Sequence, residues 1–180
     1  RLGHESGFSS DGNTFYATST ATKSITAIDV KNPKDPHAIW QGAIVSHGMT
    51  LSQNGNRAYI ADPGGNMAIL DVSEIQAHKP DPQAREVSRL TWKSASIPQN
   101  AVPFSDHGKP YVLEFDEYTQ GTTSVGDRDV VGAGRIIDIG DERHPRVVAN
   151  LRLQVNQEAD HAAASGDPGA LSPVQGYAAH

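Results

Sequence analysis

A repeat of about 43 residues constrains the fold of this chain more than any other feature, because repeats of that length mark stacked structural units. Residues 4–30 and residues 47–72 align as HESGFSSDGNTFYATSTATKSITAIDV over HGMTLSQNGNRAYIADPGGNMAILDV. In each copy a histidine comes first, an Asp-Gly or Asn-Gly pair follows, and an apolar run closes on Asp-Val. A four-stranded β-propeller blade has this length and this regular succession of turns.

The residues that follow each histidine favour short antiparallel strands. Asp-Gly at 11–12 and Asn-Gly at 54–55 supply the positive φ angles that a tight hairpin requires. The segments TFYATS and RAYIAD alternate small and bulky residues, and ITAIDV and MAILDV are apolar or β-branched runs of strand length. Because no long segment has helical periodicity, we expect an all-β fold rich in turns.

A third, more divergent copy follows the first two. Aligning Tyr111 with Tyr59 places Gln99 where His47 stands, and the segment RIIDIGDERHP matches the end of the first copy. His180 stands where a fourth copy would begin. We therefore predict one partial propeller domain over residues 1–180, with repeats at 4–46, 47–96 and 97–156 and inserted loops at 118–134 and 157–176.

About three blades with the start of a fourth do not close a ring, because propellers typically have 4 to 8 blades. Open sheet edges invite pairing with other chains. We therefore expect either the remainder of a longer propeller chain or another copy of this chain to complete the ring.

Composition excludes several classes of function. The net charge of −6 and the scattered basic residues argue against a nucleic-acid partner. No stretch approaches the roughly 20 apolar residues of a membrane-spanning helix. The chain has no cysteine, so disulfides and thiolate chemistry are excluded. The glycine pairs in DPGGN and VGAGR lack the context of phosphate or dinucleotide motifs, so no nucleotide cofactor is expected.

The segments ITAIDVKNPKDP, MAILDVSEI and RIIDIGDERHP resemble the LVIVD-repeat family of bacterial β-propellers. That resemblance implies a propeller exported from the cytoplasm, with an uncharacterised role. The chain is more distantly similar to selenium-binding-protein propellers with methanethiol oxidase activity, in which histidines near the axis bind a metal. We expect an extracytoplasmic or secreted binding platform that takes a protein or small-molecule ligand at its channel face.

Three histidines form the main candidate site. His4, His47 and His180 each open a repeat, so the innermost strands of successive blades would bring them toward the propeller axis. Imidazoles that converge in this way suit Cu, Zn, Fe or Ni, and they open the alternative of a metal-dependent, oxidoreductase-like enzyme. A purely structural interpretation has the same histidines bonded to backbone and water at the channel mouth.

Catalytic groups cannot be assigned from the sequence, but three residues are candidates. Glu5 stands beside His4 and would be a ligand, an outer partner of a ligand or a general base. Gln99 would hold a water or orient a substrate, and His161 lies among carboxylates in a long loop. A solvated loop histidine is the alternative interpretation of His161.

Other repeated or clustered residues have structural interpretations. We expect the acidic segment EFDE to be a solvated charged edge; the alternative is a Ca²⁺ site formed with the next loop. The aspartates that close one strand in each copy are expected to bond to the backbone that follows. We expect the tyrosines to fill the inter-blade core and the serines to form turns. The acidic group comprises Glu114, Asp116 and Glu117 of EFDE with Asp127 and Asp129 of the next loop; the aspartates are Asp29, Asp71 and Asp138, the tyrosines Tyr16, Tyr59 and Tyr111, and the serines Ser9 and Ser52.

Overall fold

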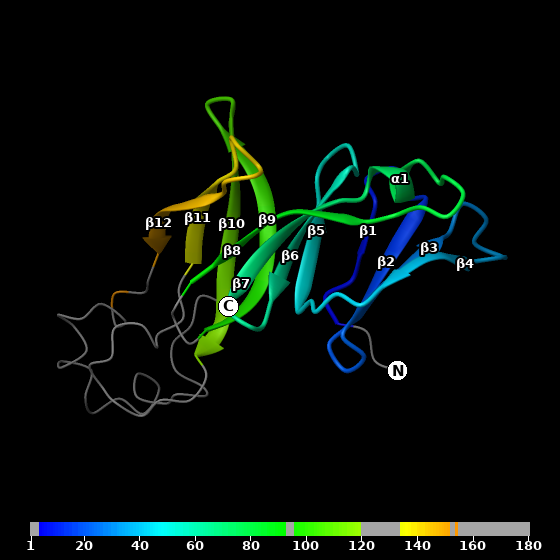
Figure 1. The fold of residues 1–180 in the computed structure, drawn as a ribbon, viewed down its shortest axis with the longest axis horizontal. Helices are drawn as coiled ribbons and strands as arrows, with labels where there is room; N and C mark the ends of the chain where they lie inside the picture. The colour runs from blue at the N-terminus through cyan, green and yellow to red at the C-terminus, as the bar shows by residue number, and fades with distance from the viewer. Residues whose placement is uncertain (1–3, 93–95, 120–133, 152–153, 155–180) are drawn as a thin grey trace.

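The computed structural model describes residues 4–92, 96–119, 134–151 and 154. Those residues form three four-stranded antiparallel sheets (Figure 1). In each sheet the strands are paired in the order in which they occur in the chain. The predicted all-β architecture of four-stranded units is therefore confirmed.

The first sheet shows how the local sequence builds each unit. Gly12 has a φ of 72° in the turn between the first two strands, and the next strand buries alternate side chains. The strands of this sheet are β1 (Gly7–Phe8), β2 (Thr14–Ser19), β3 (Ser24–Asp29) and β4 (His37–Gly42).

The second and third sheets repeat this plan, with one addition that the sequence did not predict. A single helical turn, α1 (Ser73–Gln76), follows the third strand of the second sheet and buries Ile75. Among the described residues, no helix is long and apolar enough to cross a membrane. The strands are β5 (Gly48–Leu51), β6 (Arg57–Asp62), β7 (Asn66–Asp71), β8 (Arg85–Thr91), β9 (Ser96–Asp106), β10 (Lys109–Thr119), β11 (Gly134–Asp138) and β12 (Arg146–Leu151).

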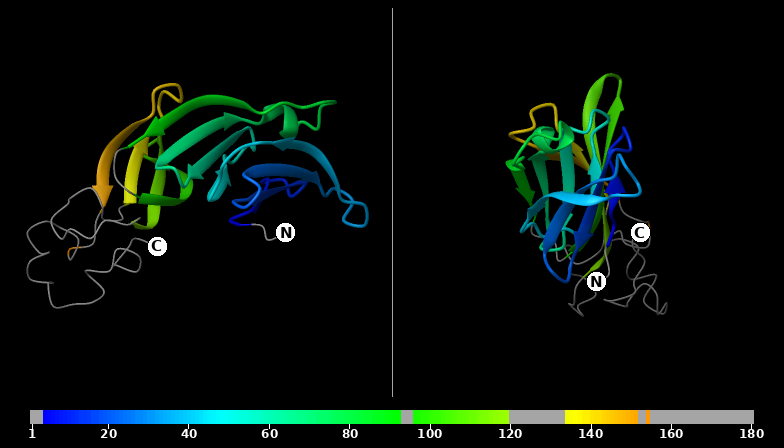
Figure 2. Two further views of the ribbon diagram at one scale, coloured as in Figure 1. Left: turned by 60° about the horizontal axis from the view of Figure 1, so that its bottom comes forward. Right: turned by 90° about the vertical axis from the view of Figure 1, so that its right-hand side faces the viewer.

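The three sheets follow one another along a curved arc (Figure 2). The first strand of each sheet contacts the first strand of the next, since β1 contacts β5 and β5 contacts β9. Two apolar clusters fill the spaces between the sheets. The first strands therefore lie next to one another, as the innermost strands of a propeller do.

The first apolar cluster lies between the first and second sheets. Tyr16 and Ala27 are opposite each other on β2 and β3, and they contribute the first sheet's side of the cluster. Ala58 and Leu70, opposite each other on β6 and β7, contribute the second sheet's side. All four side chains are at most 4% exposed. The interface thus joins one cross-strand pair from each sheet.

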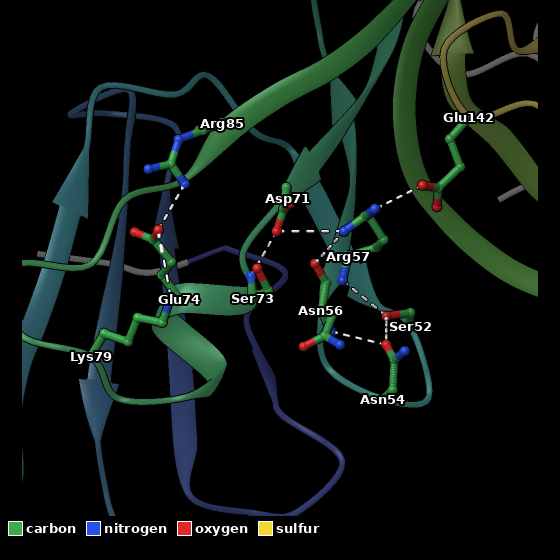
Figure 3. Close-up of polar contacts among 10 residues, drawn as sticks. All are labelled: Ser52, Asn54, Asn56, Arg57, Asp71, Ser73, Glu74, Lys79, Arg85 and Glu142. Atoms are coloured by element: carbon green, nitrogen blue, oxygen red, sulfur yellow. Dashed lines mark hydrogen bonds and ion pairs between the residues drawn. The ribbon is translucent and has the colours of Figure 1, made fainter.

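The second cluster uses the same positions one sheet further along the chain. Tyr59 and Ile69, a cross-strand pair on the other face of the second sheet, pack with Val112 and Ile137 of the third. A salt bridge from Arg57 Nε to the Glu142 carboxylate, 2.7 Å long, ties these two sheets together outside the cluster (Figure 3). The two successive interfaces therefore follow one packing rule: residues at equivalent strand positions form the contact in both.

The alignment of Tyr111 with Tyr59 was wrong by two residues. Asp71 pairs with Arg57, whereas the corresponding Asp138 pairs with Tyr111 itself. Leu113 therefore takes the position of Tyr59, and Tyr111 is only partly buried, not part of the inter-blade core. The physical reason is the β9–β10 hairpin, whose ladder extends further outward and ends at Lys109 opposite Asp106.

Candidate functional site

The first strands bring two of the predicted histidines together. The His4 N–H donates to the Thr18 carbonyl at 3.1 Å, and the His47 N–H donates to the Ala61 carbonyl at 2.8 Å. Thr18 and Ala61 occupy equivalent positions on β2 and β6, so the two histidines also occupy equivalent positions. Their ring centroids lie 4.4 Å apart with the planes inclined at 41°. Residues more than 40 positions apart in the sequence are thus in direct contact.

The His47 ring is held in one orientation by the third sheet. The His47 Nδ1 atom lies 3.0 Å from the Pro98 carbonyl oxygen, and His47 is 7% exposed. Because a carbonyl oxygen can only accept, Nδ1 carries the proton. In the neutral ring the lone pair is then on Nε2, which is the nitrogen suited to a ligand.

Gln99 lies in the third sheet at the position that His4 and His47 hold in the first two. Val102, three residues after Gln99, pairs with Leu113 just as Thr50, three residues after His47, pairs with Tyr59. The alignment of Tyr111 with Tyr59 is wrong by two residues on β10, but the β9–β10 hairpin is longer by the same amount, so the two differences cancel on β9. The predicted equivalence of Gln99 with His47 is therefore right, although the neighbouring strand was aligned incorrectly.

The Gln99 side chain is 5% exposed and only half satisfied. Its amide nitrogen donates to Glu5 Oε1 at 3.1 Å. Its carbonyl oxygen Oε1 is buried and has no hydrogen-bond partner among the residues that the structure describes. A buried acceptor without a donor is costly.

Gly48 makes the contact between the flanking sheets possible. Glu5 and Asn100 occupy the equivalent position in the first and third sheets, and Asn100 Nδ2 lies 3.4 Å from Glu5 Oε2. A Cβ atom on Gly48 would lie 2.2 Å from the Gln99 backbone oxygen, 3.2 Å from Glu5 Cβ and 3.3 Å from Asn100 Cγ. The missing side chain of the middle sheet therefore leaves the space in which the other two meet.

The donor set of the described residues is limited for a metal. Among the parts of the chain that the structure describes, no group of three or more His, Cys, Asp or Glu residues could hold an ion. His4 and His47 provide two adjacent imidazoles. His180 and His161 lie outside the described residues.

Glu114 and Asp116 of the acidic segment EFDE do not lie on a solvated edge, and for these two residues that prediction was wrong. Glu114 and Asp116 are fully buried, and both accept from Arg135 Nη1, at 2.8 and 2.7 Å. The Arg135 guanidinium carbon lies 4.4 Å from the centroid of the Trp92 ring. Burial and the Asp116 carboxylate raise the pKa of Glu114 to about 8. A cation supplied by β11 and an aromatic ring near the second sheet replace water around these carboxylates.

The structure does not describe the side chains of three other acidic residues in EFDE and the next loop. Asp127 and Asp129 lie outside the described residues, as does the side chain of Glu117. The described part of the calcium alternative, Glu114 with Asp116, is paired with an arginine.

His78 is a residue that sequence reasoning missed. Its Nδ1 atom lies 2.9 Å from Asp29 Oδ2, and its Nε2 atom lies 3.0 Å from Thr14 Oγ1. The hydroxyl–imidazole–carboxylate order is that of a catalytic triad, but Thr14 is fully buried and has no access to a substrate. The arrangement instead joins the loop after α1 to the first sheet. No spacing in the sequence connects a histidine in that loop with a strand 49 residues earlier.

The repeated aspartates and serines have the structural roles predicted for them. Each aspartate accepts a hydrogen bond from the backbone N–H two residues further on, at 2.8–2.9 Å. The serines bond to Asp11 and Asn54 in the hairpin turns, as Figure 3 shows for the second sheet. These residues are Asp29, Asp71 and Asp138, with Ser9 and Ser52.

The comparisons with known proteins agree on the fold alone. No family model matches the chain, and no curated protein matches its sequence. The β-propeller domain of Cps50 (Swd1) from Myceliophteria thermophila is 15% identical, with a TM-score of 0.58 over 84% of this chain and 43% of that one.

Two solved structures of enzyme-like proteins are equally similar. A candidate 6-phosphogluconolactonase from Bacteroides uniformis is 20% identical, with a TM-score of 0.58 over 83% of this chain and 41% of its own. The periplasmic gluconolactonase of Pseudomonas aeruginosa is 14% identical, with a TM-score of 0.58 over 83% and 39%. The chain thus spans about two fifths of the solved structures it matches. With its three packed sheets, it is a partial β-propeller.

Proposed function

We propose that this protein is an exported propeller of the LVIVD type that acts as a binding platform, with a protein or small-molecule ligand at the channel face. The observation that carries the proposal is the buried Gln99 Oε1 atom, which lacks a donor among the described residues. It lies beside Glu5, on the strand that anchors the His47 ring. Propellers include both binding proteins and enzymes, so the fold alone assigns no function.

The site favours a ligand with a polar donor group. A hydroxyl or amide N–H of the ligand would donate to Gln99 Oε1 and remove the cost of leaving that acceptor unpaired. The neutral His47 ring would accept through Nε2, because its Nδ1 atom donates to the Pro98 carbonyl, and the His4 ring is able to donate or accept. The named activities of the similar lactonases are compatible with such a ligand but do not assign one.

A fragment screen tests this proposal without knowledge of the natural ligand. The probe is a library of small polar fragments, and the readout is the NMR shift of the backbone amides and histidine rings. We expect the hits to cluster on His47 and Gln99 and to disappear in Gln99→Met. The exposed His107 provides a matched control, and His107→Phe should keep the hits. Hits that map elsewhere, or that survive Gln99→Met, would contradict the proposal.

A metal-dependent enzyme remains the second candidate because of one contact. The ring of His47 donates through Nδ1 to a backbone carbonyl, which is the usual outer contact of a metal-binding imidazole. His4 and His47 would hold the ion, together with His180, which lies outside the described residues. A transition metal bound there would supply Lewis-acid or redox chemistry.

Calorimetric titration with Cu²⁺ and with Zn²⁺ tests the metal alternative. We expect stoichiometric binding that is lost when both His4 and His47 are changed to alanine, while His37→Ala has no effect. Equal binding by the wild type and the double variant would refute a site at these histidines. Elemental analysis of the full-length protein gives an independent measure of metal content.

The proposed export rests on the resemblance of the strand-end motifs, and one similar structure is named as periplasmic. Fractionation of the native cells, with an antibody against this protein, tests it. Recovery with a periplasmic or secreted marker supports export, and recovery with a cytoplasmic marker contradicts it.

A further inference from the structure

The two outermost sheets each leave one apolar face uncovered by described residues. We call the face of the first sheet that carries Phe15 and Ile28 the leading face. We call the face of the third sheet that carries Leu113 and Ile136 the trailing face. Each name refers to a cross-strand pair, so both members of the pair lie on the same face.

These faces hold large exposed apolar side chains. On the leading face Phe8, which is 62% exposed, lies against Phe15 with ring centroids 4.8 Å apart. On the trailing face Phe104 is 39% exposed and stacks on Tyr111 with centroids 5.5 Å apart, and Val102 is 39% exposed. Adjacent exposed aromatic and aliphatic side chains of this kind mark an interaction surface.

The two interfaces between neighbouring sheets show which kind of surface would pack against these faces. Leu113 and Ile136 occupy the positions of Tyr59 and Ile69, the pair with which the second sheet packs on the third. The trailing face is therefore one half of a blade–blade interface.

The leading face is the other half. Phe15 and Ile28 occupy the positions of Ala58 and Leu70, the pair with which the second sheet packs on the first. One chain therefore carries both halves of the same interface, at opposite ends of its arc (Figure 2).

We propose that a second copy of this chain covers both faces, with the trailing face of each copy on the leading face of the other. A two-fold assembly of this kind repeats the contact twice, because residue i meets residue j and j meets i. Two copies of the three described sheets give six blades, which is within the range in which propellers close. The proposed interface would have the same arrangement of residues as the two interfaces already present between sheets within the chain.

The exposed aromatic residues provide a test that does not depend on the core. The mass of the 180-residue chain in solution, from sedimentation equilibrium, should be that of a dimer. Phe8→Glu alters only the leading face and Phe104→Glu only the trailing face, and each variant alone should be monomeric. Because Phe8 and Phe104 are exposed, we expect both variants to keep the far-ultraviolet circular dichroism of the wild type. A charge at the exposed turn, His107→Glu, is the control and should leave the dimer unchanged.

Mixing the two variants distinguishes the proposed contact from other dimers. In the mixture, the intact trailing face of the Phe8→Glu chain meets the intact leading face of the Phe104→Glu chain, so a dimer should reappear. A dimer that survives both single variants, or fails to reappear on mixing, would overturn the assignment of these faces. A monomeric wild type would also overturn it and would assign the faces to other blades, such as those of a longer chain.

Discussion

Gly48→Ala is the change that most directly tests the geometry of the candidate site. Gly48 is buried on β5, and the backbone and side chains of β9 and of the segment before β1 meet over it. The added methyl group would lie 2.2 Å from the Gln99 backbone oxygen. That separation is about 1 Å shorter than a normal carbon–oxygen contact, which is ~3.3 Å. The atom in the way belongs to the backbone, so no side-chain rotation relieves the clash.

The expected loss of stability follows from this contact. Overpacking a well-packed interior by one methyl group costs about 1–3 kcal/mol, and a backbone obstacle places Gly48→Ala at the upper end. For a chain of this size, about 3 kcal/mol corresponds to a fall in melting temperature of roughly 6–12 °C. β5 and β9 must separate to accommodate the methyl group, so the bond between Gln99 and Glu5 should weaken as well.

The assay compares thermal unfolding of Gly48→Ala with that of Gly7→Ala. Gly7 also lies on a first strand, but a Cβ atom there would have no neighbour within 4 Å. The control should be neutral or slightly stabilising, by about 0.4–1 kcal/mol, because alanine restricts the unfolded chain. Equal melting temperatures for the two variants would refute the close approach of the first strands at Gly48.

Three further changes test the polar contacts between and within the sheets. Burial raises the pKa of Glu114 to about 8, so the folded state retains a proton that the unfolded chain releases near 4.5. The free energy of unfolding should therefore fall as the pH rises between these values. Urea titrations at several pH values should show a smaller fall for Glu114→Gln than for the wild type. An equal dependence of the free energy of unfolding on pH in the two proteins would contradict the raised pKa of Glu114. Arg135→Met leaves the buried Asp116 carboxylate without its cation and the Glu114 carboxyl group without its donor, and it should cost about 3–5 kcal/mol in the same titrations at pH 7. A loss below about 1 kcal/mol would show that these groups are solvated. His78→Ala removes two hydrogen bonds to the first sheet and should cost about 1–3 kcal/mol, whereas the exposed His107→Ala should change stability by less than about 0.5 kcal/mol. Equal losses of stability in the two variants would exclude a stabilising role for the contacts of His78 with Thr14 and Asp29.

The local features of this chain could be predicted from the sequence because they depend on neighbouring residues. Asp-Gly and Asn-Gly determine where the hairpins turn, and alternating side chains determine which residues of TFYATS are buried. The bonds of Asp29 and Asp71 to the backbone two residues further on are equally local. None of these predictions required knowledge of another sheet.

The register of the third sheet shows where a pattern becomes ambiguous. A tyrosine near a turn suggested that Tyr111 corresponds to Tyr59, but the hairpin ladder extends further than in the second sheet. The length of that ladder depends on pairing between β9 and β10, which the spacing of one aromatic residue does not reveal. Leu113 therefore takes the register position of Tyr59.

The sequence by itself determined the repeat, the turns, the strand character and the equivalence of His4 with His47. Only the tertiary structure decided which equivalent residues touch and which charges are buried. Glu114 and Asp116 look solvated in the sequence because strand alternation does not reveal whether a face is covered. A neighbouring sheet covers it, and Arg135 on the adjacent strand donates to both carboxyl groups. Contacts of that kind form between segments far apart in the chain, so packing, and not local preference, determines them.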